Sequence, residues 1–272
     1  MRIFISVDME GVAGVVDETH WVLGQPNYPR ACDLMVGEAN AAIEGAVEAG
    51  ATEIVVNDSH HFGINLDAAK LHPAAKLVSG RIRPLSMCQG LCEGLDAAMF
   101  IGYHAGRGAL HACLDHTYTA ALHEVRLNGR PVNEAHINGL VAGHFGVPLV
   151  LVSGDQVLRE EMLAWNDQIV CTVVKESMGR QAVKSVHPTV AREMIQRDAA
   201  RALGMAREMP ALTLIPPLTL EITLENPQMG DILERVVAVE RTAAREVRVE
   251  ADDMLTLFRH FLTIMTMAGT VR

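Results

Sequence analysis

Two acidic residues stand directly after the first apolar run of the chain, which begins MRIFISVDMEGVAG. Asp8 and Glu10 lie two positions apart, and Gly11 follows them. If residues 2–7 form a strand, side chains two positions apart point the same way, so the carboxylates would pair at its carboxyl end. Such a pair repels unless a cation or strong donors lie between its members. A metal site is therefore one interpretation, and a capped turn with a solvent-facing Glu10 is the other.

Other residues of metal-binding or acid–base type follow later apolar runs. They are Asn57, Asp58, His60 and His61 after the second run, His104 after the third, and Glu134 at the start of a helical segment. Each has a structural explanation of its own, because Glu134 suits the first turn of a helix and His104 suits a hydrogen-bonded core position. The carboxyl ends of parallel strands, however, meet in one crevice. A mixed oxygen and nitrogen set of this size suits Zn²⁺ or Mn²⁺, and with one bridging group it can hold two ions.

The elements that must position these residues alternate between short β-rich runs and longer helical stretches. The predicted strands cover residues 2–8, 52–58, 97–104, 148–155 and 168–174, and the predicted helices between them cover 31–50 and 134–146. Near-continuous apolar strands separated by helices are typical of a parallel sheet with both faces covered. The fold class is therefore predicted to be α/β, with an open, mostly parallel sheet sandwiched by helices.

The last part of the chain has a different pattern. Asn128-Gly129 predicts a tight hairpin turn, residues 188–204 predict a helix, and Pro216-Pro217 then breaks the chain. A strand-like run, shorter β runs and an amphipathic helix over 251–269 follow. We expect a smaller C-terminal α+β unit, which gives an α/β metal-binding catalytic domain over 1–190 and a smaller domain over 191–272, with a boundary defined only to within tens of residues.

Composition limits the classes of function. The 23 basic and 33 acidic residues give a net charge of −10, which argues against nucleic acid as a partner. No apolar stretch reaches the roughly 18 residues that a membrane span needs, and the first strand turns acidic too early for a signal peptide, so we expect a cytoplasmic protein. The five cysteines lack the spacing of a zinc ribbon or a disulfide framework and are predicted to be free thiols.

Six segments of the chain together identify a family. They are SVDMEGVAG, VNDSH, LHPAAKLVSG, GYHA, NGRPVNE and AVKSVHP, in this order. The chain resembles the zinc-dependent D-aminopeptidases associated with bacterial dipeptide-transport operons. The resemblance implies a two-zinc site whose ligands correspond to Asp8, Glu10, His60, His104 and Glu134, with Asp8 as the bridging carboxylate. It also implies a small peptide substrate with an N-terminal D-amino acid, of the D-Ala-D-Ala type, and a ring-like homo-oligomer, a decamer.

The resemblance further implies a catalytic histidine shortly after the GYHA segment. His116 corresponds to it, although Asp115 stands where the family has a serine, and His111 is a rival within the same segment. An aspartate directly before a histidine does not orient its ring, because neighbouring side chains in an extended segment face apart. We expect His116 to stabilise the developing oxyanion or to move a proton to the leaving amine.

The predicted function is thus a metal-dependent aminopeptidase that uses a metal-activated water at a dinuclear zinc site. Two other classes of function are possible for these residues. One is a phosphatase in which the strand-end Asp8 attacks phosphorus, which the position of Glu10 and the many histidines fit poorly. The other is a non-catalytic peptide-binding component of a dipeptide uptake system, which the five ligand-type residues argue against.

Overall fold

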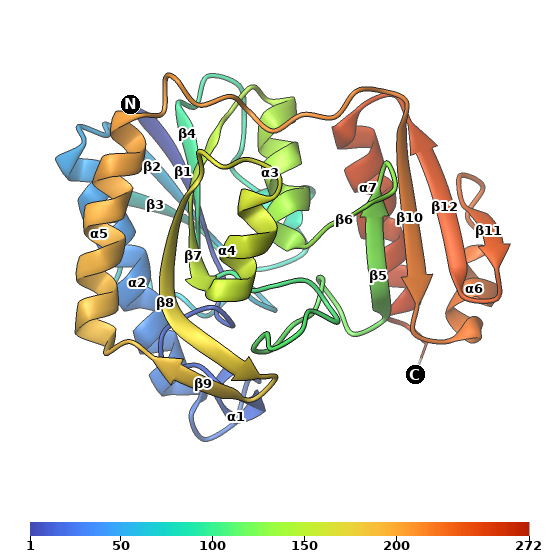
Figure 1. The fold of residues 1–272 in the computed structure, drawn as a ribbon, viewed down its shortest axis with the longest axis horizontal. Helices are drawn as coiled ribbons and strands as arrows, with labels where there is room; N and C mark the ends of the chain where they lie inside the picture. The colour runs from blue at the N-terminus through green and yellow to red at the C-terminus, as the bar shows by residue number, and fades with distance from the viewer. Residues whose placement is uncertain (272) are drawn as a thin grey trace.

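Two β-sheets lie side by side along the long axis of the molecule in the computed structural model, which describes residues 1–271 (Figure 1). The first sheet has seven strands. In spatial order they are β3 (Ala75–Val78), β2 (Glu53–Asp58), β1 (Arg2–Val7), β4 (Ala97–Ile101), β7 (Leu149–Asp155), β8 (Val170–Gly179) and β9 (Ala182–Ser185). All neighbouring pairs are parallel except β8 and β9. The predicted α/β class with an open, mostly parallel sheet is confirmed.

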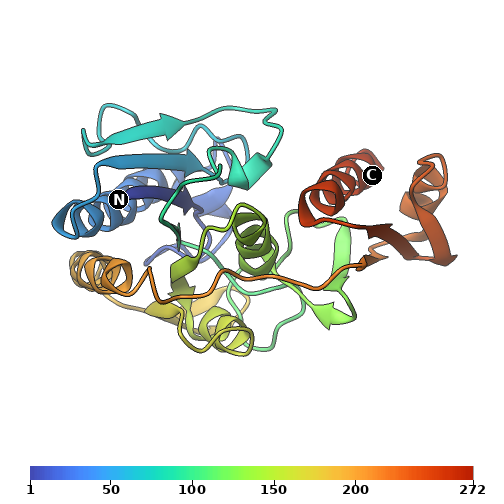
Figure 2. The same cartoon turned by 90° about the horizontal axis from the view of Figure 1, so that it is seen from above.

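Helices cover both faces of this sheet. On one face α2 (Tyr28–Glu48) and α5 (Pro188–Gly204) pack against each other and against the strands (Figures 1 and 2). On the other face lie α3 (Glu134–His144) and α4 (Gln156–Leu163), and α3 also contacts the C-terminal helix. The central strands β1, β4 and β7 are almost wholly buried, because helices lie on both sides of them. Side chains of these strands can therefore reach a ligand only at the strand ends.

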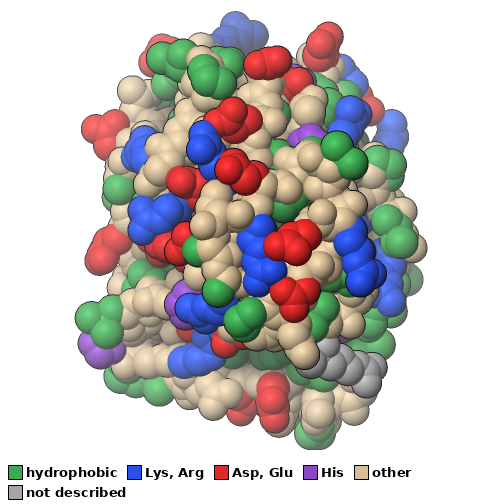
Figure 3. Space-filling model, turned by 90° about the vertical axis from the view of Figure 1, so that its right-hand side faces the viewer, with side chains coloured by type: hydrophobic (Ala, Val, Ile, Leu, Met, Phe, Trp, Pro, Cys, Tyr) green, Lys and Arg blue, Asp and Glu red, His purple; other side chains and the backbone are tan. Residues whose placement is uncertain are grey.

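The second sheet has five antiparallel strands. In spatial order they are β11 (Glu240–Ala243), β12 (Glu246–Ala251), β10 (Leu218–Leu224), β5 (Leu122–Leu127) and β6 (Arg130–Pro131). Helices α6 (Pro227–Leu233) and α7 (Met254–Ala268) pack against it. Acidic and basic side chains are interspersed over the face seen in Figure 3, and ion pairs join Arg241 to Asp231 and Glu234. The predicted smaller α+β unit in the C-terminal part is confirmed.

The hairpin β5–β6 comes from the middle of the chain but pairs within the second sheet. Asn128 and Gly129 have φ angles of 48° and 74°, as the predicted tight primed turn requires. Helix α5, by contrast, follows the first sheet and lies against α2. The division into 1–190 and 191–272 stays a prediction.

Several short elements are absent from the sequence prediction. Strand β3 is only four residues long and half-buried at a sheet edge, so its apolar pattern is weak. Helix α4 begins directly after β7, with the Asp155 carboxylate accepting hydrogen bonds from the amides of Val157 and Leu158. The remaining three are β9 (Ala182–Ser185), α1 (Glu18–Trp21) and the 3-10 turn η1 (Ser86–Cys88).

The cysteines and the apolar helices were also subjects of prediction. All five cysteines are free, as predicted. Within residues 1–271, no helix combines the length and the apolar character that crossing a bilayer requires.

Candidate metal centre

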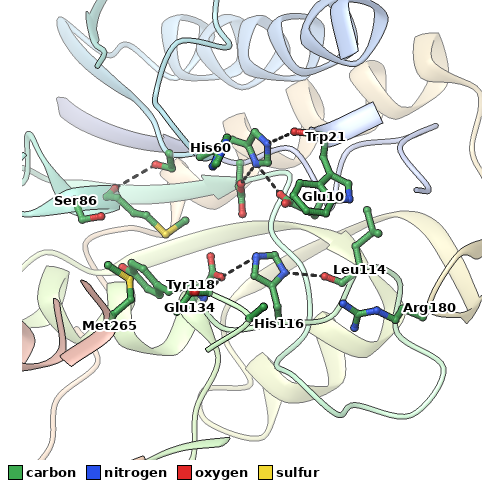
Figure 4. A pocket seen from close by; sticks show the side chains of 16 residues that line it. Glu10, Trp21, His60, Ser86, Leu114, His116, Tyr118, Glu134, Arg180 and Met265 are labelled. Atoms are coloured by element: carbon green, nitrogen blue, oxygen red, sulfur yellow. Dashed lines mark hydrogen bonds and ion pairs between the residues drawn. The ribbon is translucent and has the colours of Figure 1, made fainter. Parts of the chain in front are cut away.

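A cavity of about 370 Å³ lies at the carboxyl ends of β1, β2 and β4. Its walls include Asp8, Glu10, His60, His116 and Glu134, four of which are labelled in Figure 4. The cavity therefore occupies the crevice where an open parallel sheet binds ligands.

A sharp turn brings Asp8 and Glu10 into this cavity. Strand β1 ends at Val7, and both carboxylates are 3% exposed. The chain then bends at Gly11, whose amide donates to the carbonyl of Gly102 at 2.7 Å. A Cβ atom on Gly11 would lie 1.8 Å from the carbonyl oxygen of Tyr103, so only glycine fits. The glycine that follows the acidic pair thus lets the β1 turn approach the end of β4.

The three histidines of the centre share one arrangement. Each places one ring nitrogen against a backbone carbonyl: His60 Nε2 at 2.9 Å from Trp21, His104 Nδ1 at 3.0 Å from Ala105, and His116 Nδ1 at 2.8 Å from Leu114. A carbonyl oxygen only accepts, so each of these nitrogens carries a hydrogen. The opposite nitrogen is left facing the carboxylates. Metal-binding histidines are oriented by this kind of outer hydrogen bond.

Except between His60 and Glu10, the distances between histidine nitrogens and carboxylate oxygens of the centre are longer than most hydrogen bonds. His60 Nδ1 lies 3.3 Å from Asp8 Oδ1, and His104 Nε2 lies 3.5 Å from Asp8 Oδ2. His104 Nε2 is also 3.4 Å from Glu134 Oε1, and it is buried without a hydrogen-bond partner among the described residues. Tetrahedral ligands about 2.0–2.1 Å from a zinc ion lie about 3.3 Å from one another. The spacing therefore fits side chains arranged around metal ions.

Two groups of three donor side chains have the spacing of metal ligands. They are Asp8, Glu10 and His104, and His104, His116 and Glu134, and within each group the donor atoms lie within 4.8 Å of one another. His60 adjoins the first group, because its Nδ1 lies 2.9 Å from Glu10 Oε2. All five predicted ligands and His116 are thus brought together.

The charges of the centre call for a cation. Burial raises the pKa of Asp8 to about 7, and the neighbouring Glu10 carboxylate adds to the effect. Burial works to lower the pKa of His104, but the carboxylates of Glu134 and Asp8 outweigh it and raise that pKa to about 10. The buried carboxylates thus favour the protonated, positively charged form of His104. A bound divalent ion would supply that charge in place of protons, so the residues present fit a metal.

His111 and His61 lie outside the donor groups. His111 is exposed, with a φ of 55°, and its Nδ1 lies 3.2 Å from the carbonyl oxygen of Met178. His61 is exposed at the rim of the cavity, and its φ of 48° shows that the loop there is not extended.

Sequence reasoning missed the side chains that hold the ligand-bearing loops. Lys175, a buried residue of β8, donates to the carbonyl oxygens of Glu10, Val12 and Val15, the last at 2.9 Å. A lysine directly after the apolar run of residues 168–174 was the available signal.

A second support joins the segments that carry His104 and Glu134. The Glu161 carboxylate of α4 accepts from the Gly106 amide at 3.0 Å and from Asn133 Nδ2 at 2.6 Å. Asn133 is the N-cap of α3, and its Oδ1 accepts from the His136 amide at 2.9 Å. Because Gly106 and Asn133 flank the two ligands, Glu161 ties the ligand-bearing segments together.

Comparison with known proteins assigns the chain to a family. A family model described as "Peptidase_M55: D-aminopeptidase" matches residues 1–263. The chain belongs to the M55 family of D-aminopeptidases. Membership makes it a metallopeptidase, as the sequence predicted, and sets aside the phosphatase and peptide-binding interpretations.

A sequence comparison and a structure comparison of this M55 chain both lead to Bacillus subtilis. A D-aminopeptidase of strain 168 is 34% identical over 269 residues, which cover 98% of each chain. The solved structure of the zinc-dependent D-aminopeptidase DppA, a self-compartmentalizing protease, superposes with a TM-score of 0.96 at 33% identity and covers 99% of this chain and 98% of that one. The M55 fold is therefore shared over nearly the whole length.

Proposed function

We propose that this M55 enzyme hydrolyses short peptides that begin with a D-amino acid, such as D-Ala-D-Ala, at a centre that holds two Zn²⁺ ions. The observation that carries the proposal is the placement of Asp8. Its two carboxylate oxygens face different histidines, Oδ1 toward His60 and Oδ2 toward His104, at 3.3 and 3.5 Å. A carboxylate placed in this way suits a bridge between two ions.

The remaining ligands divide on either side of this bridge. His60 and Glu10 would complete one ion site, and His104 and Glu134 the other, which agrees with the hydrogen bonds and spacings of the centre. Nitrogen and carboxylate donors of this kind suit Zn²⁺, with Mn²⁺ as the alternative. The zinc dependence of the Bacillus subtilis relative supports the choice of zinc.

Bound at this centre, zinc would act as a Lewis acid toward the scissile carbonyl and toward water. His116 supplies the proton chemistry. Its Nδ1–H is fixed on the carbonyl of Leu114, so Nε2 is the atom that exchanges a proton. Nε2 lies 3.6 Å from Glu134 Oε1, at the wall of the cavity. Once Nε2 has accepted the proton that the attacking water loses, His116 can donate a hydrogen bond to the developing oxyanion or pass that proton to the leaving amine.

Glu134 is kept in place by the segment that follows His116. The backbone amide of Tyr118 donates to Glu134 Oε1 at 2.5 Å, and the Tyr118 hydroxyl donates to Asn138 Oδ1. Tyr118 in turn packs edge-on against Phe261 of α7, at 4.9 Å between ring centroids. The second sheet and its helix thus contribute to the shape of the site.

Hydrolysis of matched dipeptides tests the proposal. The zinc-loaded protein should cleave D-Ala-D-Ala and leave L-Ala-L-Ala and p-nitrophenyl phosphate unchanged. A chelator should abolish the cleavage, and added Zn²⁺ should restore it. Cleavage of L-Ala-L-Ala at the same rate, or full activity in the presence of chelator, would refute the proposal.

The assembly is proposed from the relative that is a self-compartmentalizing protease. We infer a ring-like homo-oligomer, with a decamer as its size, and light scattering on the purified protein measures it. A monomer at micromolar concentration would refute this part alone. The cytoplasmic location stays a prediction from the sequence.

A further inference from the structure

One strongly basic side chain reaches the cavity of the metal centre. Among the cavity-lining residues within 1–271, Arg180 is the only lysine or arginine. It lies in the turn between β8 and β9, and its side chain is 60% exposed. Figure 4 shows its guanidinium group on the same side of the cavity as His116 and Leu114.

Arg180 is tied to the segment that precedes His116. Its Nη1 donates to the Asp115 carboxylate and, at 2.7 Å, to the Asp115 carbonyl oxygen. Its own carbonyl accepts from the amide of Leu114 at 3.0 Å. Asp115 is itself 7% exposed and accepts from the Gly108 amide at 2.7 Å. The guanidinium is thus held one peptide unit from the proposed acid–base residue.

These bonds leave part of the guanidinium free. Both side-chain bonds leave from Nη1, and no hydrogen bond from Nε or Nη2 to another residue of 1–271 is present. A guanidinium presents its N–H groups in a planar fork that matches a carboxylate. Arg180 can therefore keep its bond to Asp115 and still receive a second carboxylate.

A dipeptide substrate brings such a carboxylate to this place. Its scissile carbonyl must reach the metal centre, and its C-terminal carboxylate follows one residue later, about 3.3–3.6 Å further along the chain. In a protein of net charge −10, a substrate carboxylate that lies beyond the metal ions is stabilised where a cation receives it. The cavity volume of about 370 Å³ also suits a small ligand.

We propose that Arg180 binds the C-terminal carboxylate of dipeptide substrates, with Asp115 as the residue that positions it. The inference rests on the proposed function and names the substrate class more closely, as dipeptides with a free carboxylate. It also gives a role to Asp115, which stands where the resembling family has a serine before the histidine.

Kinetics on a dipeptide and its amide test the proposal. Wild-type protein should cleave D-Ala-D-Ala with a higher kcat/KM than D-alanyl-D-alaninamide. Arg180→Met should lower kcat/KM for D-Ala-D-Ala by about 10- to 100-fold, mainly through KM, because one charge-assisted hydrogen-bonded contact is lost. The same variant should change kcat/KM for the amide by less than about 3-fold. Arg180→Lys should restore part of the loss.

Arg197 offers a matched control on α5. Its side chain is 67% exposed and pairs with Asp198, whose side chain is 10% exposed, as the Asp115 side chain is beside Arg180. Arg197→Met should leave both substrates unaffected, and zinc content should be the same in all variants. An equal loss on both substrates in Arg180→Met, or a wild-type enzyme that does not distinguish acid from amide, would overturn the inference. Failure of zinc-loaded wild type to cleave either compound would instead refute the proposed function, and the inference with it.

Discussion

His116 stacks face to face on His104, with ring centroids 4.1 Å apart and ring planes inclined by 12°. The Nε2 atoms of both rings face the same oxygen, Glu134 Oε1, at 3.4 and 3.6 Å. Their surroundings differ, because His104 is 1% exposed while His116 lines the cavity. The stack places a ligand-type histidine behind one that a substrate can reach.

This relationship gives His116 and His104 different predicted roles. His116→Ala should keep its zinc and lose about 10²- to 10⁴-fold in kcat, the range for removing a positioned acid or base. His111→Ala is the control, and its rate should be close to wild type because His111 is exposed outside the donor groups. Steady-state rates and elemental analysis measure both. Loss of zinc from His116→Ala would instead make His116 a ligand.

Replacing the bridging carboxylate should affect both ion sites. Asp8→Ala should lower zinc content and activity together, because the two oxygens of Asp8 face both His60 and His104. His61→Ala should retain wild-type zinc content, since His61 is at the rim and in neither donor group. Unchanged zinc content in Asp8→Ala would remove Asp8 from the centre.

Glu161 should act on zinc binding without touching the ion. Glu161→Ala removes the acceptor shared by Gly106 and Asn133, so zinc affinity should fall about 10- to 100-fold, as is typical for residues that orient metal ligands. Glu161→Gln keeps one acceptor oxygen and should restore most of the affinity. The control variant is Glu160→Gln, because the side chain of the neighbouring Glu160 is 68% exposed. Competition with a chelator measures the affinity, and a wild-type value in Glu161→Ala would disprove the role.

Glu38 should make stability depend on pH. This α2 residue is 2% exposed, and burial raises its pKa from 4.5 to about 7. Between these values the folded protein binds more protons than the unfolded chain, so the free energy of unfolding falls as the pH rises. The full change is on the order of 3 kcal/mol.

Glu38→Gln should therefore flatten the dependence of unfolding free energy on pH between 4.5 and 7. The free energy of unfolding of Glu38→Gln minus that of wild type should increase as the pH rises across this window. Glu44→Gln, at an exposed position of the same helix, should leave the dependence unchanged. Urea unfolding at several pH values measures both variants. Parallel curves for Glu38→Gln and wild type would contradict the prediction.

The residues at the strand ends were predictable from the sequence for a physical reason. Parallel strands end at one edge of a sheet, so Asp8, His60 and His104 must come close once their strands are adjacent. The hairpin was predictable as well, because Asn128-Gly129 matches the positive φ angles of its turn.

The sequence could not supply the supports that come from distant segments. Lys175 lies 165 residues from Glu10, and no local pattern links them. The choice between His111 and His116 depends on an irregular loop in which His111, Leu114 and Tyr118 all have positive φ. Residues with such angles break the side-chain alternation on which sequence reasoning relies.

The number of zinc ions bound per chain tests the central claim most directly. Elemental analysis of the purified, zinc-saturated protein should give two ions per chain, because Asp8 places one oxygen toward each of two histidines. One ion per chain would contradict the dinuclear centre, and none would contradict the metal centre altogether.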